Sequence, residues 1–560
     1  MYVFDADLPF SEANVATKVI EGQSDFTLLI KADGKYLDKS FFINKFLNTG
    51  PKCLLILRPP GFGKSLNLSM LRYFLDEQIS DQGVVFNKLS VMQDSSIVRD
   101  HMGKHPVVFL SLKGCTASSW ATMRREIWDA LVTMCRPFIK TDEKTFFGDL
   151  INSNYLGNPP SAFPENVTDV SLRRVFVRLV DRVHRISGKS VIVLIDDYDT
   201  PFGVSFADAS EDEKRLVFFR SFFSAVLKDN PKTYRACLTG VFEVRLSTLW
   251  SGLDNLTVVS VANDPVFTDC FGLSETEMRN FLVSQMHKPV EMSGELCEYY
   301  GGYFGCQKLV TSNNFFKYIM NGFRITPTIP EGLFEYVMEQ DVYLDDVIEV
   351  IFALTSRHDS LGKRSPVGRI DPTLPPQGSR LLKGQLPHLL CMTGYLTYES
   401  VKGEVWIPNM GALLEWKRML AKIYGYNSID DLKTFYRGLA NALSSFDEIL
   451  ISFFIKQATT SLSPLLGGNM HLYERFIRGI IDHLDLGRLC GNVICFDGEN
   501  RSVTVKFNHC ESRKRCLGKI FHPKRTHIIT ANHNELYVCC VIRGRPEEGI
   551  MDVECVPITS

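Results

Sequence analysis

Five short apolar segments in the first half of the chain constrain its fold more than any other feature. Each is rich in Val, Leu and Ile and is bounded by Gly, Pro or polar residues, which is typical of a buried strand. The segments are residues 53–59, 105–112, 190–197, 234–241 and 255–263. Because helical stretches alternate with them, the pattern predicts an α/β fold with a mostly parallel sheet covered on both faces.

Two of the helical stretches have clear apolar patterns, SLNLSMLRYFLDEQ (65–78) and EKRLVFFRSFFSAVLK (213–228). In the first, helical spacing predicts a buried face formed by Leu66, Met70, Tyr73 and Phe74.

The rest of the chain divides by composition. A stretch rich in Pro, Gly and Arg, residues 357–380, is the best linker candidate. The last hundred residues contain one helical run, LYERFIRGIIDHL, and four strand-like runs, GNVICFD, SVTVKFN, THIITA and LYVCCVIRG. We therefore expect a loose leader over residues 1–25 and five regions: an α/β core (1–263), a helical extension (264–356), a linker (357–380), a connecting region with a strand pair and helices (381–450), and a small α/β domain (451–560).

Composition excludes some classes of protein. With 62 Lys and Arg against 64 Asp and Glu, the net charge is −2, which argues against a globally basic nucleic-acid binder but not against a local basic patch. The first residues are acidic, and no apolar run approaches the roughly 18 residues of a membrane span. We expect no signal peptide and no membrane contact. Fifteen scattered cysteines then indicate reduced thiols in an intracellular protein, cytoplasmic or nuclear.

Residues 58–71, RPPGFGKSLNLSML, have the pattern of a phosphate-binding loop between a strand and a helix. Gly63 allows close backbone approach to phosphate, Lys64 supplies a cation, and the Ser65 hydroxyl can ligate Mg²⁺. This P-loop, or Walker A, pattern predicts a site for ATP with Mg²⁺ formed by Gly61, Phe62, Gly63, Lys64, Ser65 and Leu66. Arg58 replaces the first glycine of the strict motif, and the alternative is a chance Gly-Lys-Ser at a helix start.

VIVLIDDYDTP (191–201) ends a predicted strand in three acids. A buried strand that presents a carboxylate at its carboxyl end is typical of the Walker B position beside the phosphates. We expect Asp196 to hold Mg²⁺ and Asp197 to polarise the attacking water, whereas Asp199 caps the next turn. The alternative is a strand that ends in an ordinary polar turn.

A third strand end adds a hydroxyl. The separation of 132 positions between Lys64 and Asp196 (196 minus 64) leaves room for one intervening strand, HPVVFLSL, as in ATPases with an extra strand between the two motifs. YRACLTGV then ends near Thr239, which could act as a sensor of the γ-phosphate. An ordinary threonine at a strand end is an equal alternative.

Several ordered blocks resemble the AAA-ATPase-like family, whose members often carry a C-terminal PD-(D/E)XK nuclease-type domain. DGKYLDKSFFINKFL (33–47) is similar to its Tyr-x-Asp-Lys-Thr/Ser block, and residues 55–75 to its Arg-Pro-Arg-Arg-Phe-Gly-Lys-Ser-Leu block. VLIDDYDTP is similar to its Leu-Ile-Asp-Glu-Tyr-Asp-x-Pro. The later matching blocks are LTGVFEVRLSTLWSGLDNL, FGLSETEM, CEYYGGYFG, TGYLT and VWIPN.

Two departures from the family pattern concern catalysis. Pro60 and Gly61 replace two arginines, which removes two cations and is expected to loosen the loop backbone. Asp197 replaces a glutamate and is shorter by one methylene. Both changes argue against hydrolysis of the nucleotide more strongly than against its binding.

The C-terminal region is similar to the nuclease-type domain in its helix YERFIRGIIDHL (473–484), but it departs at the expected metal site. The family's Glu-x-Lys is best matched by Thr504-Val505-Lys506, where the acid is absent. Asp497 and Glu499 lie upstream without convincing spacing. A site with one carboxylate at most binds metal poorly, so we expect a degenerate, inactive nuclease-like domain.

Two further patterns lie in this region. The basic cluster ESRKRCLGKIFHPKRTH (511–527) could bind nucleic acid through phosphates or could be a solvated loop. A Cys/His-rich stretch fits zinc-site spacing only loosely, and predicted strands separate its pairs. Its members are Cys490, Cys495, His509, Cys510, Cys516, His522 and His527.

Together these features predict an ATP-binding protein, a Mg²⁺-dependent ATPase that acts as a molecular switch with an inactive nuclease-like domain. Two alternatives stay open: a pseudo-ATPase that binds nucleotide or partners without turnover, and an ATP-coupled enzyme that processes nucleic acid. The sequence does not identify a protein partner.

Overall fold

We describe the fold from a computed structural model of the chain. The residues it describes are 23–32, 34, 36–48, 51–139, 146–147, 167–202, 209–241, 244, 249, 253, 255–260, 266–286, 288, 292–303, 309–320, 368–369, 386–399, 404–423, 426, 428–445, 447, 449–457, 489–497, 502–509, 537–545 and 550–558. Most of the predicted leader, the basic cluster and the helix predicted at 473–484 lie outside these residues.

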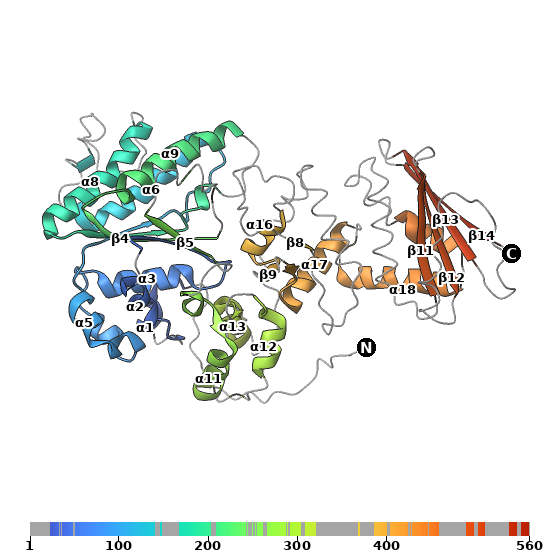
Figure 1. The fold of residues 1–560 in the computed structure, drawn as a ribbon, viewed down its shortest axis with the longest axis horizontal. Coiled ribbons are helices and arrows are strands. Elements are labelled where there is room, and N and C mark those ends of the chain that lie inside the picture. Colours follow the sequence, from blue (N-terminus) through green and yellow to red (C-terminus); the bar gives the residue numbers. More distant parts are fainter. Residues whose placement is uncertain are drawn as a thin grey trace.

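All five predicted strands form one parallel sheet (Figure 1). They are β1 (Cys53–Leu57), β2 (Val107–Ser111), β3 (Val191–Asp196), β4 (Thr233–Gly240) and β5 (Leu256–Ser260). β1 and β3 are buried along their whole length, and β2 at three of its five residues, as expected of a sheet covered on both faces. The predicted α/β fold is confirmed.

The strand order is β2-β3-β4-β1-β5, so one strand separates β1 from β3. That strand is β4. The segment HPVVFLSL, which lies between the two motifs in the sequence, forms β2 at the edge of the sheet. Parallel strands end at a common edge of the sheet. At this edge, Leu57 of β1 pairs with Gly240 of β4 and Ser260 of β5, and Asp196 of β3 pairs with Ser111 of β2.

Helices cover the two faces of the sheet with separate apolar cores. On one face, α6 (Trp120–Ile139), α8 (Asp169–Ser187) and α9 (Ala209–Leu227) pack against Leu55 and Leu57. On the other, α1 (Phe26–Lys31), α2 (Phe41–Asn48) and α3 (Lys64–Leu75) pack against Leu54 and Ile56. This division follows from the alternation of side chains along a strand. Shorter elements follow α3: α4 (Gln82–Val85), the 3₁₀ helix η1 (Ser90–Gln93) and α5 (Ser95–His101).

Helix α3 differs from its prediction in the face that it buries. Its buried apolar residues are Leu68, Met70, Leu71, Phe74 and Leu75, whereas Leu66 and Tyr73 are only half-buried at the margin of the core. Leu68 and Leu71 are fully buried in the same core as Leu54 and Ile56 of the sheet, so the side of α3 toward the sheet lies next to the predicted face.

The residues described between 266 and 320, which lie in the predicted helical extension, are mainly helical. The elements there are η3 (Thr268–Cys270), β6 (Leu273–Ser274), α11 (Glu275–Met286), α12 (Met292–Tyr300), β7 (Leu309–Val310) and α13 (Ser312–Met320). In Figure 1, α11, α12 and α13 lie on the same side of the sheet as α2 and α3. Their own small core includes Leu273, Leu282 and Phe315.

The predicted strand pair near residue 400 is present. β9 (Thr397–Glu399) pairs antiparallel with β10 (Glu404–Trp406), which also pairs with β8 (Gly368–Arg369), inside the predicted linker. α16 (Leu386–Thr393) precedes this sheet. α17 (Met410–Ile423), α18 (Ile429–Ser445) and a helix over 449–457 follow it.

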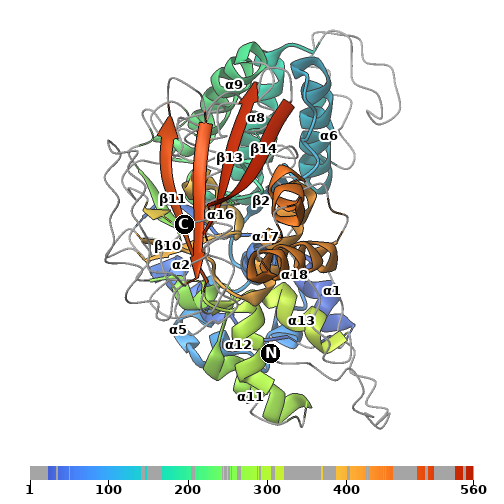
Figure 2. The ribbon, with the colours of Figure 1, turned by 90° about the vertical axis from the view of Figure 1, so that its right-hand side faces the viewer.

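The C-terminal strands form a separate antiparallel meander at the end of the molecule opposite the large sheet (Figure 1). They are β11 (Leu489–Asp497), β12 (Ser502–His509), β13 (Tyr537–Arg545) and β14 (Ile550–Ile558), and Figure 2 shows them side by side. Three of the four strands correspond to predicted runs. The fourth run, THIITA, lies outside the described residues, and β14 was not predicted.

Within the described part of the chain, every helix is too short or too polar to cross a bilayer.

Candidate functional site

The candidate site lies where the strands of the large sheet end. The loop 58–63 follows β1, Asp196 is the last residue of β3, and Thr239 is the next-to-last residue of β4. Tyr198 N donates to Thr239 O at 3.0 Å, which fixes the turn after β3 against the end of β4. The fold therefore brings the loop, the acids and Thr239 to one edge, as the sequence predicted.

The loop has the backbone of an anion cradle. Gly61 and Gly63 have φ of +82° and +83°, a region that favours glycine. Helix α3 begins at Lys64, and no side chain caps its N-terminus. Ser65 and Leu66 lie half-buried in its first turn. A helix start with this geometry can bind an anion through its N-terminal N–H groups.

The loop is held by backbone contacts from distant segments. Asn313 N donates to Gly61 O at 3.1 Å, and Gly272 N donates to Phe62 O at 3.1 Å. The Phe62 ring is buried and meets the Tyr303 ring edge-on, with centroids 5.4 Å apart. The helical extension therefore contacts the loop at Gly61 and Phe62, which the comparison of Pro60 and Gly61 with the family's arginines did not consider.

The surroundings and backbone of Gly61 do not favour a larger residue such as arginine. A Cβ on Gly61 would lie 3.2 Å from the Asn313 Cβ, and the positive φ would add backbone strain. Sequence alone could not reveal this contact, which joins residues some 250 positions apart in the chain.

Lys64 is buried, with 8% of its surface exposed. Its Nζ donates to Arg58 O at 2.9 Å and to Pro59 O at 3.2 Å, so the ammonium lies within the curve of the loop. Burial lowers the pKa of Lys64, and the carboxylates of Asp199, Asp197 and Asp196 oppose that shift. The three acids and the lysine thus form one electrostatic group.

Asp196 and Thr239 are directly bonded. Thr239 Oγ1 donates to Asp196 Oδ1 at 2.6 Å, and both residues are buried, at 1% and 4% exposure respectively. A charged acceptor makes this a strong hydrogen bond. Thr239 therefore orients the carboxylate predicted to hold Mg²⁺, a contact that its prediction as a phosphate sensor did not include.

Asp197 follows β3 with φ of +52°, a conformation that Asp tolerates better than most residues. Burial, together with the adjacent Asp196 carboxylate, raises its pKa to about 6, although Lys64 acts in the opposite direction. A carboxyl with a pKa near 6 is suited to accept a proton near neutral pH.

Asp199 Oδ2 accepts a hydrogen bond from Val241 N at 2.7 Å, so it ties the turn after β3 to the end of β4. We expected it to cap the turn after it, where η2 (Thr200–Phe202) begins. Gly240 leaves room for this arrangement, since a Cβ there would lie 2.7 Å from Asp199 Oδ1 and 2.6 Å from Tyr198 Cε1.

Arg58, at the missing first glycine of the motif, points away from the loop. It is 1% exposed, its Nη1 donates to Leu57 O at 2.9 Å and to Val259 O at 3.3 Å, and its guanidinium lies 5.2 Å from the centre of the Phe271 ring. The residue links β1 to β5 and does not extend toward the cradle.

Four residues near this site were given no role from the sequence. Lys39 and Glu277 lie in the family blocks 33–47 and FGLSETEM, whereas Asn67 and Asn313 were not singled out. One signal was available, because Ser274-Glu-Thr-Glu277 is a capping-box pattern that marks the start of α11.

Comparisons with known proteins agree with this geometry. Residues 21–250 match the model of a family described as a predicted AAA-ATPase, which confirms the resemblance for that region. An uncharacterized protein in the vnfD 5′ region of Azotobacter chroococcum mcd 1 is 26% identical over 272 residues, which are 48% of this chain and 45% of that protein. The chain therefore matches about half the length of this relative.

Proposed function

We propose, from the premise that residues 21–250 match the predicted AAA-ATPase family, that this chain binds ATP with Mg²⁺ at residues 61–66 and hydrolyses it. Conversion between the ATP- and ADP-bound forms would make it a molecular switch. In this proposal, residues 1–263 are the ATPase core and 264–356 its helical extension, and 357–380 and 381–450 join them to a domain at 451–560.

The buried Lys64 is the observation that carries the proposal. An ammonium with lowered pKa, held by two loop carbonyls at the start of an uncapped helix, costs free energy to bury. A polyanion that accepts bonds from Lys64 and from the first N–H groups of α3 offsets that cost. The phosphates of a nucleotide have this chemistry.

The residues at the strand ends also fit a divalent cation. Asp196 has one oxygen engaged by Thr239, and its charge lies beside Lys64, so the remaining oxygen and the Ser65 hydroxyl would hold Mg²⁺. Bound Mg²⁺ would neutralise charge on the β- and γ-phosphates. Asp197, with its raised pKa, would accept a proton from the attacking water.

A second candidate function is nucleotide binding without turnover. One observation favours it: Asp197 is shorter than the family's glutamate and its backbone is fixed at positive φ, which limits its reach. Steady-state turnover by the full chain separates the two functions, since only an ATPase releases phosphate.

Calorimetric titration of the full chain with ATP, with and without Mg²⁺, tests nucleotide binding. We expect binding that Mg²⁺ strengthens, because the cation screens the phosphates from Asp196, Asp197 and Asp199. A chain that binds neither ATP nor ADP under both conditions would overturn the proposal.

We also propose that the C-terminal domain is an inactive nuclease-like domain. Lys506 lies on β12 opposite Asn492 on β11 and Cys539 on β13, and Thr504 lies opposite Cys495 and Val541. No acid is therefore opposite either position in the paired strands. A lysine without two nearby carboxylates does not organise a metal-bound water.

We expect the full chain to leave DNA and RNA intact in Mg²⁺ or Mn²⁺, with or without ATP, when intact substrate is followed on gels. Weak binding that falls steeply with salt would agree with the basic residues Lys514, Arg515, Lys524 and Arg525. Cleavage by the wild type that disappears in Lys506→Ala would show that the domain is an active nuclease.

A further inference from the structure

One segment, residues 266–277, which follows β5 and extends into the first turn of α11, contacts the phosphate loop and its helix at three points. Gly272 N donates to Phe62 O at 3.1 Å. The Asn67 side chain on α3 donates to Cys270 O at 2.8 Å, and the Phe271 ring lies against the Arg58 guanidinium. The position of the phosphate loop therefore depends on how this segment is itself held.

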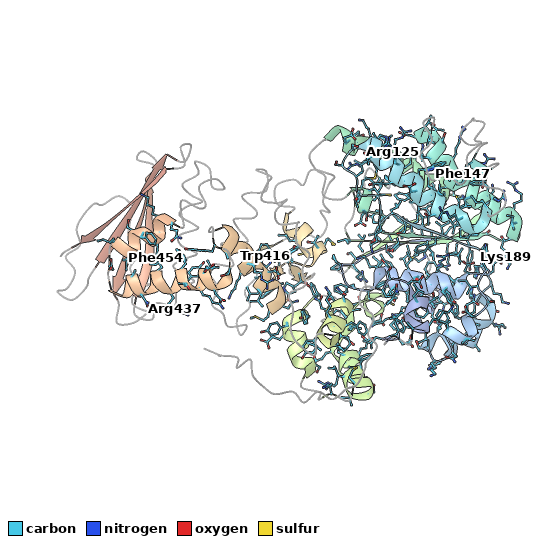
Figure 3. All side chains as sticks on the ribbon, turned by 180° about the vertical axis from the view of Figure 1, so that it is seen from behind. Arg125, Phe147, Lys189, Trp416, Arg437 and Phe454 are labelled. Carbon is cyan, nitrogen blue, oxygen red and sulfur yellow. The ribbon has the colours of Figure 1, made fainter. Side chains whose placement is uncertain are left out.

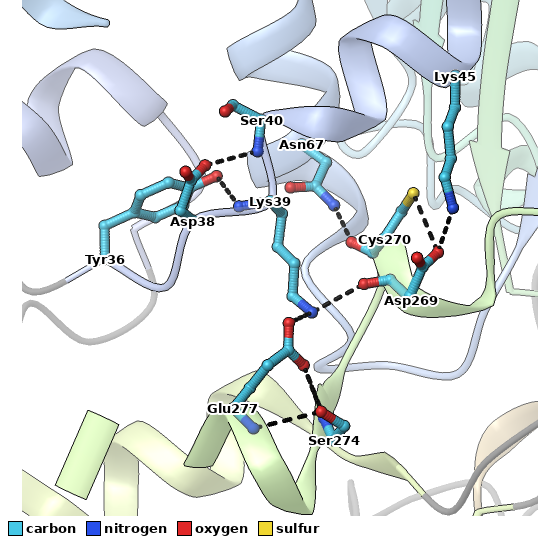
Figure 4. Close-up of polar contacts among 10 residues, drawn as sticks. All are labelled: Tyr36, Asp38, Lys39, Ser40, Lys45, Asn67, Asp269, Cys270, Ser274 and Glu277. Carbon is cyan, nitrogen blue, oxygen red and sulfur yellow. Dashed lines mark hydrogen bonds and ion pairs between the residues drawn. The ribbon is translucent and has the colours of Figure 1, made fainter. Parts of the chain in front are cut away.

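The segment is held at its far side by two lysines (Figure 4). Lys39 Nζ donates to Asp269 O at 2.8 Å and to Glu277 Oε1 at 2.5 Å. Lys45 Nζ lies 2.6 Å from Asp269 Oδ1. Lys39 thus joins the two ends of the segment, Asp269 in η3 and Glu277 in α11.

Lys39 is placed for this contact by a fixed backbone. Its N–H donates to the Tyr36 hydroxyl at 3.2 Å. The Asp38 carboxylate accepts from Ser40 N at 2.8 Å and from Ser90 N at 2.7 Å. The Lys39 side chain is only 7% exposed, so its ion pair is screened less than a surface pair.

The two carboxylate oxygens of Glu277 bind different partners. Oε2 accepts from Ser274 N and Ser274 Oγ, both at 2.9 Å, while Ser274 Oγ accepts from Glu277 N at 3.3 Å. These reciprocal bonds are a capping box that starts α11. Oε1 binds Lys39, so one carboxylate connects the start of the helical extension to the ion pair.

We propose that Lys39 and Glu277 are positioning residues for the phosphate loop. They fix the 266–277 segment, and this segment fixes Phe62 and Asn67 beside Lys64. Loss of the ion pair frees the segment, and the loop then samples arrangements that do not bind phosphate. The effect on nucleotide affinity rests on the proposed function, whereas the effect on loop mobility does not.

Lys39→Met and Glu277→Gln test the proposal. The glutamine keeps an acceptor for Ser274 but carries no charge, so the capping box is largely retained. Lys39→Arg restores a cation. The matched control is Lys189→Met, since Lys189 Nζ also bridges a glutamate and a backbone carbonyl, at 2.8 Å from Glu77 Oε2 and 2.9 Å from Lys104 O. Figure 3 shows Lys189 at the end of the molecule far from α11–α13.

Two measurements are made on each full-length variant, well below its thermal midpoint. We expect Lys39→Met and Glu277→Gln to weaken Mg-ATP affinity by about tenfold and to speed amide hydrogen exchange over residues 59–75. Lys39→Arg should recover most of the affinity. Lys189→Met should change neither the affinity nor exchange over residues 59–70; residues 71–75 are left out of this comparison because Glu77, the partner of Lys189, follows α3 closely.

Unchanged exchange over residues 59–75 in both variants would overturn the proposal, even if nucleotide affinity fell. Faster exchange with unchanged affinity would also overturn it, because the loop would then not need this positioning. If the wild type does not bind nucleotide, the proposed function fails, and the exchange data alone decide whether the ion pair holds the loop.

Discussion

We expect Lys64→Ala to weaken the binding of Mg-ATP by about tenfold or more, or at least 1.4 kcal/mol. Lys64 is the first residue of α3, and its ammonium is held inside the curve of the loop by Arg58 O and Pro59 O. Phosphate oxygens that replace these carbonyls form charge-assisted hydrogen bonds, which the alanine variant cannot form.

Calorimetry on both proteins measures this effect, with Lys52→Ala as the control. Lys52 directly precedes β1 at the opposite end of that strand, where its Nζ donates to Asn230 O at 3.1 Å. Equal affinities of wild type, Lys64→Ala and Lys52→Ala would remove the assignment of residues 61–66 as a phosphate site.

The second large effect is expected at Asp197. Asp197→Asn should abolish hydrolysis while ATP still binds, since the amide cannot accept a proton from water. In the wild type, kcat/KM should rise with pH through about 6 and then level off, because Asp197 must be ionised to act as a base. A phosphate-release assay across this pH range checks both statements. Turnover in Asp197→Asn equal to that of the wild type would exclude Asp197 as the base.

Asp197→Asn should also stabilise the fold near neutral pH. The folded pKa of about 6 lies above the ordinary value of 3.8, so ionisation destabilises the folded state progressively as pH rises from about 4 to above 6. At about 1.4 kcal/mol per pKa unit, the neutral amide recovers up to about 3 kcal/mol. Denaturant unfolding at pH 5 and pH 8 should show the larger gain at pH 8.

The Asp197→Glu variant distinguishes the two proposed functions, hydrolysis of ATP and nucleotide binding without turnover. The longer acid restores the reach of the family's glutamate, so we expect the rate of hydrolysis to be preserved or raised. The φ of +52° adds about 1 kcal/mol of backbone strain in the variant. A wild type without turnover that gains none from glutamate would favour nucleotide binding alone.

Several local patterns were sufficient to predict the core of the fold. The five strands could be predicted because a buried parallel strand is a short continuous run of apolar residues, and each run here is bounded by Gly, Pro or polar residues. The start of α3, predicted at Ser65 and found at Lys64, and the acidic end of β3 followed from the motifs. The apolar face of α3 was misjudged, because the pattern of Leu66 and Tyr73 fits a helix face but does not say which side meets the sheet.

The sequence by itself determined the α/β class, the parallel strands and the residues at their ends, since these depend on local hydrophobic periods and on motifs of a few residues. Tertiary structure decided which strand lies between β1 and β3, that Thr239 bonds to Asp196, that Asn313 and Gly272 bond to the loop, and that Lys39 bonds to Asp269 O. These contacts join residues from 43 to 252 positions apart (239 minus 196 and 313 minus 61). The physical reason is that a pairing between distant residues depends on packing of the whole chain, and no local pattern encodes it.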